Sequence, residues 1–144
     1  MNDVLFSHKS DEWGTPQELF DELDAEFNFT LDPCATADNH KCDKYYTREQ
    51  NGLLKSWKNE IVFCNPPYSK VADWVRKCAY ERLIHGTTSV LLIPARTDTK
   101  WFHEYIYRGG AEIRFIKGRL KFGDSKNSAP FPSMICIFKP KEEI

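Results

Sequence analysis

The tetrapeptide Asn65-Pro66-Pro67-Tyr68 follows a short apolar run, residues 61–64, and carries the clearest chemical signal in the sequence. Its two prolines favour an extended backbone and remove two N–H donors. An asparagine side-chain oxygen and a row of backbone carbonyls, all hydrogen-bond acceptors, therefore remain beside an aromatic ring. This set complements a planar base that carries an exocyclic amino group, such as adenine.

The chemistry that such acceptors support is transfer of a group to the amino nitrogen. The lone pair of adenine N6 is delocalised into the ring. Hydrogen bonds to the Asn65 side chain and the Pro66 carbonyl would favour a pyramidal nitrogen and stabilise its developing positive charge. Tyr68 would stack on a flipped-out base and hold it for in-line attack on a methyl sulfonium. We therefore expect Asn65, Pro66, Pro67 and Tyr68 to be catalytic; a proline-rich turn with a capping asparagine is the simpler alternative.

The segment before this motif predicts one helix and one strand. Thr15 can cap a helix, Pro16 suits its first position, and Glu18 completes a capping box. Apolar and polar residues then alternate over 27–31, which is typical of a strand, and this strand is expected to end at Asp32.

After the motif, helices and strands continue to alternate. Asp98 can cap one helix, which Gly109-Gly110 closes. Ser69 can cap an earlier one, whose apolar positions are Val71, Trp74, Val75, Cys78, Ala79 and Leu83. Short apolar runs predict strands at 61–64, 90–93 and 134–138, alternating apolar residues predict one at 111–115, and Tyr45-Tyr46 is a weaker candidate.

This alternation predicts an α/β fold with a mainly parallel sheet. The last two strands are joined by a short, helix-poor segment, 117–133, so we expect them to form an antiparallel pair at one edge. In open α/β sheets, ligands bind beyond the carboxyl ends of the strands. Residues 32–35, 65–68 and 94–96 should then lie together at one end of the sheet.

Length and composition indicate one domain over residues 1–144, in which 1–10 form a loose N-terminal arm. The chain has no room for a separate target-recognition domain. No apolar run approaches the roughly 20 residues that span a membrane. The N-terminus also has no basic segment followed by an apolar stretch, so we expect no signal peptide and an intracellular protein.

The five cysteines are an odd number, and we expect reduced, mostly buried thiols. Cys34, His40, Cys42 and Cys64 could be considered as zinc ligands, but the sequence contains no CxxC pair. We therefore predict no metal site.

The charge of the chain is unevenly distributed. Residues 61–144 contain 14 Lys and Arg against 8 Asp and Glu, whereas residues 1–60 contain 6 against 13. A basic stretch lies between Arg108 and Lys126 and could meet a phosphate backbone, although a solvated surface is the alternative.

In these motifs and their order, the sequence resembles the phage-type DNA N6-adenine methyltransferases (Dam-like) over about residues 11–140. Residues 13–16 look like the family's N-terminal motif for S-adenosylmethionine (SAM), 31–35 like its first cofactor motif, and 65–68 like its catalytic motif. Residues 92–99, 117–122 and 129–133 match later blocks.

The resemblance implies a Rossmann-like, SAM-dependent methyltransferase fold that acts on double-stranded DNA as a monomer or homodimer. It suggests a phage or prophage origin and action in the bacterial cytoplasm. The cofactor site would comprise Trp13, Thr15, Pro16, Asp32, Pro33, Cys34, Ala35, Asn51 and Asn65. The expected DNA contacts are Arg96, Lys117, Arg119, Lys121 and Lys126.

Two features depart from the family pattern. Residues 32–35 contain no glycine-rich turn, and Asn51 stands where the family has an Asp that is expected to bind the cofactor adenine. Two other functions stay open: methyl transfer to an amino or amide nitrogen of RNA or protein, and an inactive protein that only binds DNA.

Overall fold

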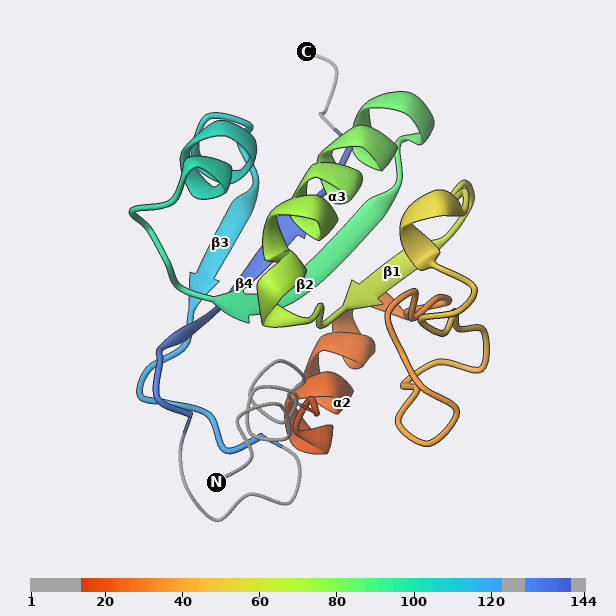
Figure 1. The fold of residues 1–144 in the computed structure, drawn as a ribbon, viewed down its shortest axis with the longest axis horizontal. Coiled ribbons are helices and arrows are strands. Elements are labelled where there is room, and N and C mark those ends of the chain that lie inside the picture. The colour runs from red at the N-terminus through yellow and green to blue at the C-terminus, as the bar shows by residue number, and fades with distance from the viewer. Residues whose placement is uncertain (1–13, 123–128, 141–144) are drawn as a thin grey trace.

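The computed structural model describes residues 14–122 and 129–140. The predictions for the N-terminal arm, Trp13 and Lys126 lie outside these residues. The described part contains a four-stranded sheet with helices on both faces (Figure 1). Its strands are β1 (Ile61–Cys64), β2 (Thr88–Pro94), β3 (Glu112–Phe115) and β4 (Ser133–Phe138). Its helices are α2 (Gln17–Phe27), α3 (Val71–His85), the π-helix η3 (Phe102–Tyr107), and the 3₁₀ turns η1 (Gly52–Leu54) and η2 (Tyr68–Lys70).

The sheet has the order β1-β2-β4-β3, and the prediction of a mainly parallel sheet is wrong. Only β1 and β2 pair in parallel, while β4 pairs antiparallel with both β2 and β3. The expected antiparallel pairing of the last two strands is confirmed, but β4 inserts between β2 and β3 instead of adding outside them. As a result β1, β2 and β3 still run in the same direction and end at one end of the sheet, the carboxyl end.

The strand predicted over 27–31 is not formed. Helix α2 continues to Phe27, and Asn28 ends it in the left-handed conformation (φ 56°). Leu31 and Asp32 then make single parallel bridges to Val62 and Tyr45. The sheet is thus extended beyond β1 by two short extended segments, one at 31–32 and one at 45, rather than by regular strands.

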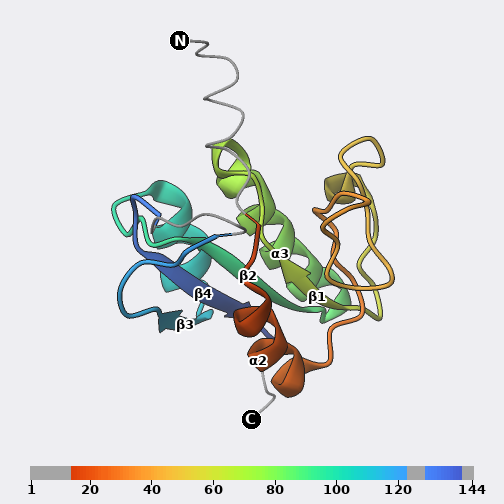
Figure 2. The same ribbon diagram turned by 90° about the horizontal axis from the view of Figure 1, so that it is seen from below.

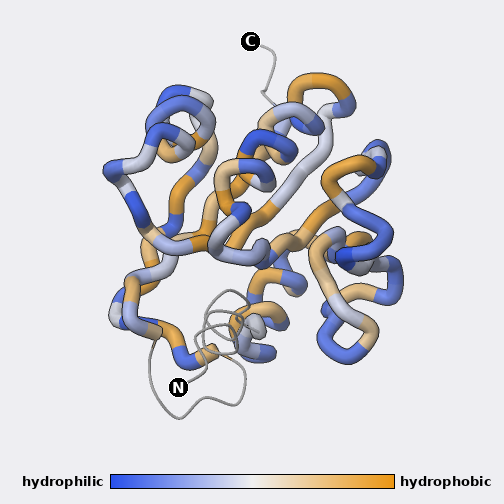
Figure 3. Tube along the Cα trace, viewed as in Figure 1, coloured by the Kyte–Doolittle hydropathy of each residue, from blue (hydrophilic) through white to orange (hydrophobic). Residues whose placement is uncertain are grey.

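At β1, β2 and β4 both faces of the sheet are buried, which explains the continuous apolar runs of these strands. One face packs against α3 and η3, and the other packs against α2, on the opposite side of the sheet (Figure 2). Successive residues alternate between the two sides, so Leu91 belongs to the α3 side and Leu92 to the α2 side. Hydrophobic colour follows the central strands, while the connection between α2 and β1 is largely hydrophilic (Figure 3).

The helix starts differ in detail from the sequence predictions. Pro16, rather than Thr15, occupies the N-cap position of α2. At the start of η3, the Thr99 hydroxyl, rather than Asp98, accepts a hydrogen bond from the Phe102 N–H. In α3, Leu83 is 82% exposed and the buried position on that turn is Glu81. Glu81 can be buried because it has polar partners in Trp57, Lys77 and His85.

Four of the five cysteines are buried and Cys34 is partly exposed; all five are free thiols, as predicted. Within residues 14–122 and 129–140, no three His, Cys, Asp or Glu side chains are grouped as metal ligands. No helix in the same ranges has the length and apolar character needed to cross a membrane.

Candidate active site

The predicted catalytic motif leaves the carboxyl end of β1 and turns into η2 and α3. Asn65 is the first residue after the strand, and its Nδ2 donates a hydrogen bond to Thr15 Oγ1 at 2.9 Å. Thr15 is 8% exposed and immediately precedes Pro16, the N-cap residue of α2. The bond therefore joins two segments 50 residues apart, and it turns the carbonyl oxygen of the Asn65 amide away from Thr15.

A cavity of about 730 Å³ lies beside this bond. Its lining comes from four parts of the chain: the residues before α2, the segment after Leu31, the loop around η1, and the end of β1 with the start of α3. The lining residues are Gly14, Thr15, Asp32, Pro33, Cys34, Ala35, Thr36, Asp38, Asn39, Lys41, Thr47, Arg48, Asn51, Gly52, Leu53, Phe63, Asn65, Pro67, Ser69, Lys70, Asp73 and Trp74.

The structure brings most of the predicted cofactor residues together in this cavity. The predicted residues in its lining are Thr15, Asp32, Pro33, Cys34, Ala35, Asn51 and Asn65. Of the predicted catalytic residues, Asn65 and Pro67 are also part of the lining, whereas Pro66 is not. Pro16 is not part of it either and occupies the N-cap position of α2, while Pro66 is buried.

Asp32 gives the cavity a buried carboxylate. It is 4% exposed, and its Oδ2 accepts the backbone N–H of Lys41 at 2.9 Å. Burial raises the pKa of Asp32 to about 6, although the backbone N–H groups of Lys41 and Cys34 oppose that shift. The carboxylate is therefore ionised at neutral pH but poorly solvated, so a cation placed in the cavity would stabilise it.

The loop around η1 forms another wall of the cavity. Asn51 adopts the left-handed conformation (φ 55°), which asparagine tolerates better than most residues, and its Oδ1 accepts the Leu53 N–H at 3.2 Å. Gly52 packs directly on the first cofactor motif, since a Cβ there would lie 2.1 Å from the Pro33 carbonyl oxygen. Glycine is therefore required where these two walls meet.

Tyr68 lies outside the lining of the cavity, at its Asn65 side. Its ring packs edge-on against Phe131, with 4.6 Å between the centroids and 75° between the ring planes. Burial raises the pKa of Tyr68, and the nearby positive charge of Arg96 opposes the shift. Tyr68 is therefore a neutral aromatic group. It follows β1 and lies near Arg96, which follows β2, and near Phe131, which precedes β4.

The predicted DNA-contacting residues follow strands that end at the same carboxyl end of the sheet. Arg96 follows β2, and Lys117, Arg119 and Lys121 follow β3; all four are exposed. The two segments are tied to the start of β4 by the Ala95 N–H to Pro132 O bond and the Ile116 N–H to Ser133 O bond.

Arg114, which belongs to the basic stretch seen in the sequence, is used differently. Its two terminal nitrogens each bond a Glu26 oxygen at 2.7 Å, and its Nε bonds Glu112 at 2.5 Å. This cation therefore ties β3 to α2.

Several lining residues had no clear signal in the sequence. They include Lys41, Thr47, Arg48, Ser69, Lys70, Asp73 and Trp74. Lys41, Thr47 and Arg48 lie on the irregular connection between α2 and β1, where residue type and spacing do not determine which way a side chain points. For Gly52 the sequence does indicate a turn, because glycine after asparagine is typical of turns.

Comparison with known proteins places the sequence among DNA-modifying enzymes of phages. Residues 4–144 match the family described as "DNA N-6-adenine-methyltransferase (Dam)". The chain is 33% identical over 144 residues to the "DNA N-6-adenine-methyltransferase" of Haemophilus phage HP1 (strain HP1c1), with 92% of this chain and 82% of the relative covered. It is 38% identical over 112 residues to the protein of the same name from Escherichia phage T1, with 76% of this chain and 46% of that longer relative covered. The chain therefore belongs to the DNA N-6-adenine-methyltransferase (Dam) family.

Proposed function

We propose that this protein transfers the methyl group of SAM to the N6 amino group of adenine in double-stranded DNA. The observation that carries the proposal is the position of Asn65. Its side chain is bonded to Thr15 and lines the same cavity as the Asp32 carboxylate. An acceptor for the amino group and a site for a cationic donor thus share one space, as direct transfer requires.

The lining of the cavity fits SAM in size and chemistry. The buried Asp32 carboxylate suits the positive charge of the cofactor, and the volume of about 730 Å³ holds a nucleoside with an amino-acid chain. Asn51 Nδ2 is a donor, so it suits a ring nitrogen of the cofactor adenine, where the family's Asp would accept a hydrogen bond instead. When bound, SAM supplies an electrophilic methyl group on a sulfonium.

The chain's own residues prepare the attacking nitrogen. Because Thr15 accepts from Nδ2, the Asn65 carbonyl oxygen is oriented to accept a hydrogen bond from the adenine amino group. The Pro66 carbonyl is the second acceptor in this proposal. Both oxygens would stabilise the positive charge that develops on N6, without reorganising during the reaction. The excess proton then leaves N6 to solvent or to a neighbouring acceptor.

The adenine must leave the duplex to reach this point. Tyr68 and Phe131 form an aromatic pair beside Asn65, with Arg96 nearby, and we propose that they receive the flipped base. The exposed cations Arg96, Lys117, Arg119 and Lys121 would hold the flanking phosphates. Sequence preference would then come from loops of one domain.

The fold supports a Rossmann-like assignment in a specific way. Starting from the segment at Leu31, the chain adds Tyr45 on one side and β1 on the other, so the direction of strand addition reverses between Leu31 and β1. In doubly wound sheets, ligands bind at the carboxyl ends next to such a switch point. The cavity lies there, between the residues after Leu31 and the residues after β1.

Labelled methyl transfer to three acceptors distinguishes this proposal from its alternatives. The protein is incubated with methyl-tritiated SAM and equal masses of unmethylated double-stranded DNA, RNA or protein extract. We expect label in DNA alone. Label in RNA or protein would move the acceptor, and DNA binding without SAM binding or transfer would indicate an inactive DNA-binding protein.

A further inference from the structure

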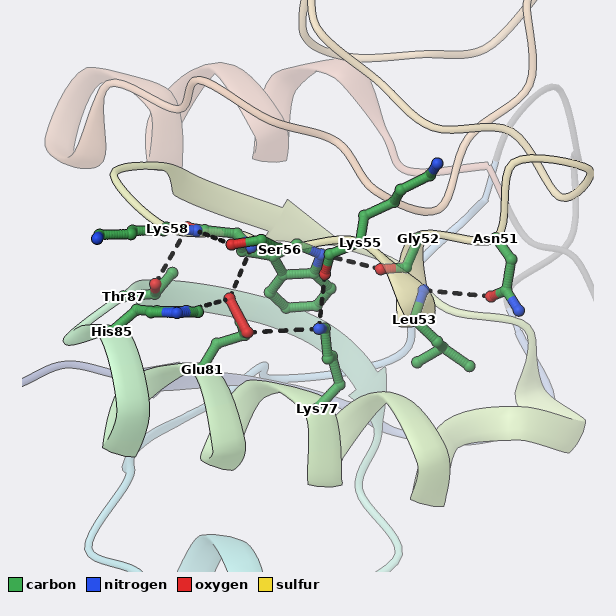
Figure 4. A network of polar contacts seen from close by, with 11 residues as sticks. Asn51, Gly52, Leu53, Lys55, Ser56, Lys58, Lys77, Glu81, His85 and Thr87 are labelled. Carbon is green, nitrogen blue, oxygen red and sulfur yellow. Dashed lines mark hydrogen bonds and ion pairs between the residues drawn. The ribbon is translucent and has the colours of Figure 1, made fainter.

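Glu81 is a buried carboxylate that the proposed chemistry does not use. It lies on α3 and is 1% exposed, among the most deeply buried side chains described. Its Oε1 accepts the Trp57 backbone N–H at 2.6 Å and contacts His85 Nδ1 at 3.0 Å, while Lys77 Nζ lies 3.3 Å from Oε2 (Figure 4). A buried charge is retained only where partners compensate its desolvation, and Glu81 has three.

The balance of these effects keeps Glu81 ionised. Burial raises the pKa of Glu81, but hydrogen bonds from His85, from the Trp57 backbone and from Lys77 outweigh burial and bring the pKa below its usual value. The charged form is thus the one that the surrounding groups stabilise.

From Glu81, two connections lead to the loop that lines the cavity. The first runs through Trp57, which is fully buried and donates from its ring Nε1 to the Gly52 carbonyl at 3.0 Å. The second runs through Lys77, which donates to the Lys55 carbonyl at 2.7 Å. Both connections end on backbone carbonyl oxygens of this loop, and Figure 4 shows them in one network.

The loop is also packed tightly against the first cofactor motif. Gly52 packs on Pro33 so closely that no Cβ fits between them. The Trp57 ring also stacks against Trp74, a lining residue, with 6.2 Å between the centroids. Loss of the support behind Gly52 would therefore let the loop move away from Pro33 and widen the cavity between its two cofactor-facing walls.

We propose that Glu81 is a positioning residue for the cofactor wall: through Trp57 and Lys77 it holds Asn51, Gly52 and Leu53 at the spacing that binds SAM. The inference rests on the proposed function, since it assumes that SAM occupies this cavity. It predicts an effect on cofactor affinity in particular, because Glu81 is remote from the acceptors for the base.

The test compares Glu81→Ala, Glu81→Gln and Lys77→Met with Glu26→Gln, a matched control whose carboxylate pairs with Arg114 outside the cavity. SAM and S-adenosylhomocysteine binding is measured by calorimetry, and kcat and both KM values by methyl transfer to DNA. We expect Glu81→Ala to raise Kd and KM for SAM by about tenfold or more, the scale of a lost hydrogen bond to a charged group. The kcat at saturating SAM and the KM for DNA should stay within about twofold, as for any change confined to cofactor binding.

Glu81→Gln keeps an acceptor for the Trp57 N–H, so we expect it to restore most of the affinity, with Lys77→Met intermediate. A folded Glu81→Ala protein with wild-type SAM affinity would overturn the inference, as would equal losses in kcat and in both KM values. If Glu81→Ala does not fold, Lys77→Met decides, and unchanged SAM affinity there also overturns it. Failure of the wild-type protein to bind SAM would instead remove the proposed function, and this inference with it.

Discussion

Thr15 Oγ1 accepts a hydrogen bond from Asn65 Nδ2 at 2.9 Å, which links the segment before α2 to the first residue of the predicted catalytic motif. In the proposed mechanism, a hydroxyl at this position would determine which atom of the Asn65 amide faces the substrate. Without it, the amide can rotate by half a turn and present a donor, where the amino group of adenine needs an acceptor.

The first prediction concerns this bond. Thr15→Val keeps the shape of the side chain but removes the acceptor, so we expect kcat to fall about tenfold, the scale of one lost hydrogen bond. Thr15→Ser keeps the hydroxyl and should restore most of the rate. Steady-state kinetics with separately measured SAM affinity check this, and a Val variant with full kcat would show that Thr15 does not orient Asn65.

The second prediction concerns Asn65 itself. Asn65→Ala removes an acceptor that acts on the developing charge, and we expect kcat to fall by about 10²–10³-fold, as for loss of one preorganised group of this kind. SAM binding, measured by calorimetry, should be largely retained. Equal losses of SAM binding and transfer would assign Asn65 to the cofactor site instead.

The third prediction follows from the pKa of Asp32, which burial raises to about 6. In the proposed complex cationic SAM pairs with the ionised carboxylate, so the affinity should be constant well above pH 6 and should fall by up to about tenfold per pH unit well below it. Calorimetry between pH 5 and 8 measures this. Asp32→Asn should bind SAM weakly and without that pH dependence; a wild-type affinity that is flat across this range would exclude Asp32 as the partner of the cation.

The same carboxylate has an effect of opposite sign on folding. The folded protein holds the Asp32 proton more tightly than the unfolded chain, so this group's contribution to stability decreases as pH rises from about 4 to about 6. A shift from 3.8 to about 6 corresponds to at most roughly 3 kcal/mol. Asp32→Asn should therefore raise Tm at pH 8 more than at pH 5. An equal change in Tm at both pH values would contradict this.

A fourth prediction uses Gly52. Gly52→Ala puts a Cβ 2.1 Å from the Pro33 carbonyl, so the backbone must shift and SAM affinity should fall. Gly110→Ala is the control, because no atom lies within 4 Å of its Cβ position and only its positive φ (76°) opposes the change. That control should lose about 1 kcal/mol of stability and keep its SAM affinity. Equal SAM affinities for the two variants would argue against the close packing of the walls.

A fifth prediction concerns DNA. Replacing Arg119 and Lys121 with Ala should weaken DNA binding for all sequences and reduce the slope of log K against log salt by about 2. Lys58 and Lys139 are exposed cations next to the start of β1 and the end of β4, at the opposite end of the sheet. The same double substitution there should leave the slope unchanged. An unchanged slope for Arg119 and Lys121 would remove them from the DNA site.

The sequence predicted those parts of the site that depend on residue type at a strand end. Asp32 and Asn65 follow short apolar segments, and parallel pairing of Leu31 with Val62 brings the two together. The insertion of β4 between β2 and β3 could not be predicted in this way. The apolar run of β4 indicates a buried strand but does not indicate which strands it pairs with.

Glu81 shows a second limit of sequence reasoning. The spacing Trp74, Cys78, Glu81 continues the buried face of α3, but an apolar pattern assigns that turn to Leu83 instead. The partners that make burial of the carboxylate possible, Trp57 and Lys77, become apparent only in three dimensions. Likewise the contact between Gly52 and Pro33 depends on how two loops meet. The single-domain organisation and the oligomeric state stay predictions.

The central claim is that Asn65 and its neighbours act on the amino group of adenine. It is tested most directly by digesting reacted double-stranded DNA to nucleosides and analysing them by mass spectrometry, with wild-type protein and Asn65→Ala in parallel. We expect N6-methyladenine as the methylated nucleoside from the wild-type reaction, and little or none from Asn65→Ala. A methylated cytosine, or unmodified DNA from a wild-type protein that binds both SAM and DNA, would contradict it.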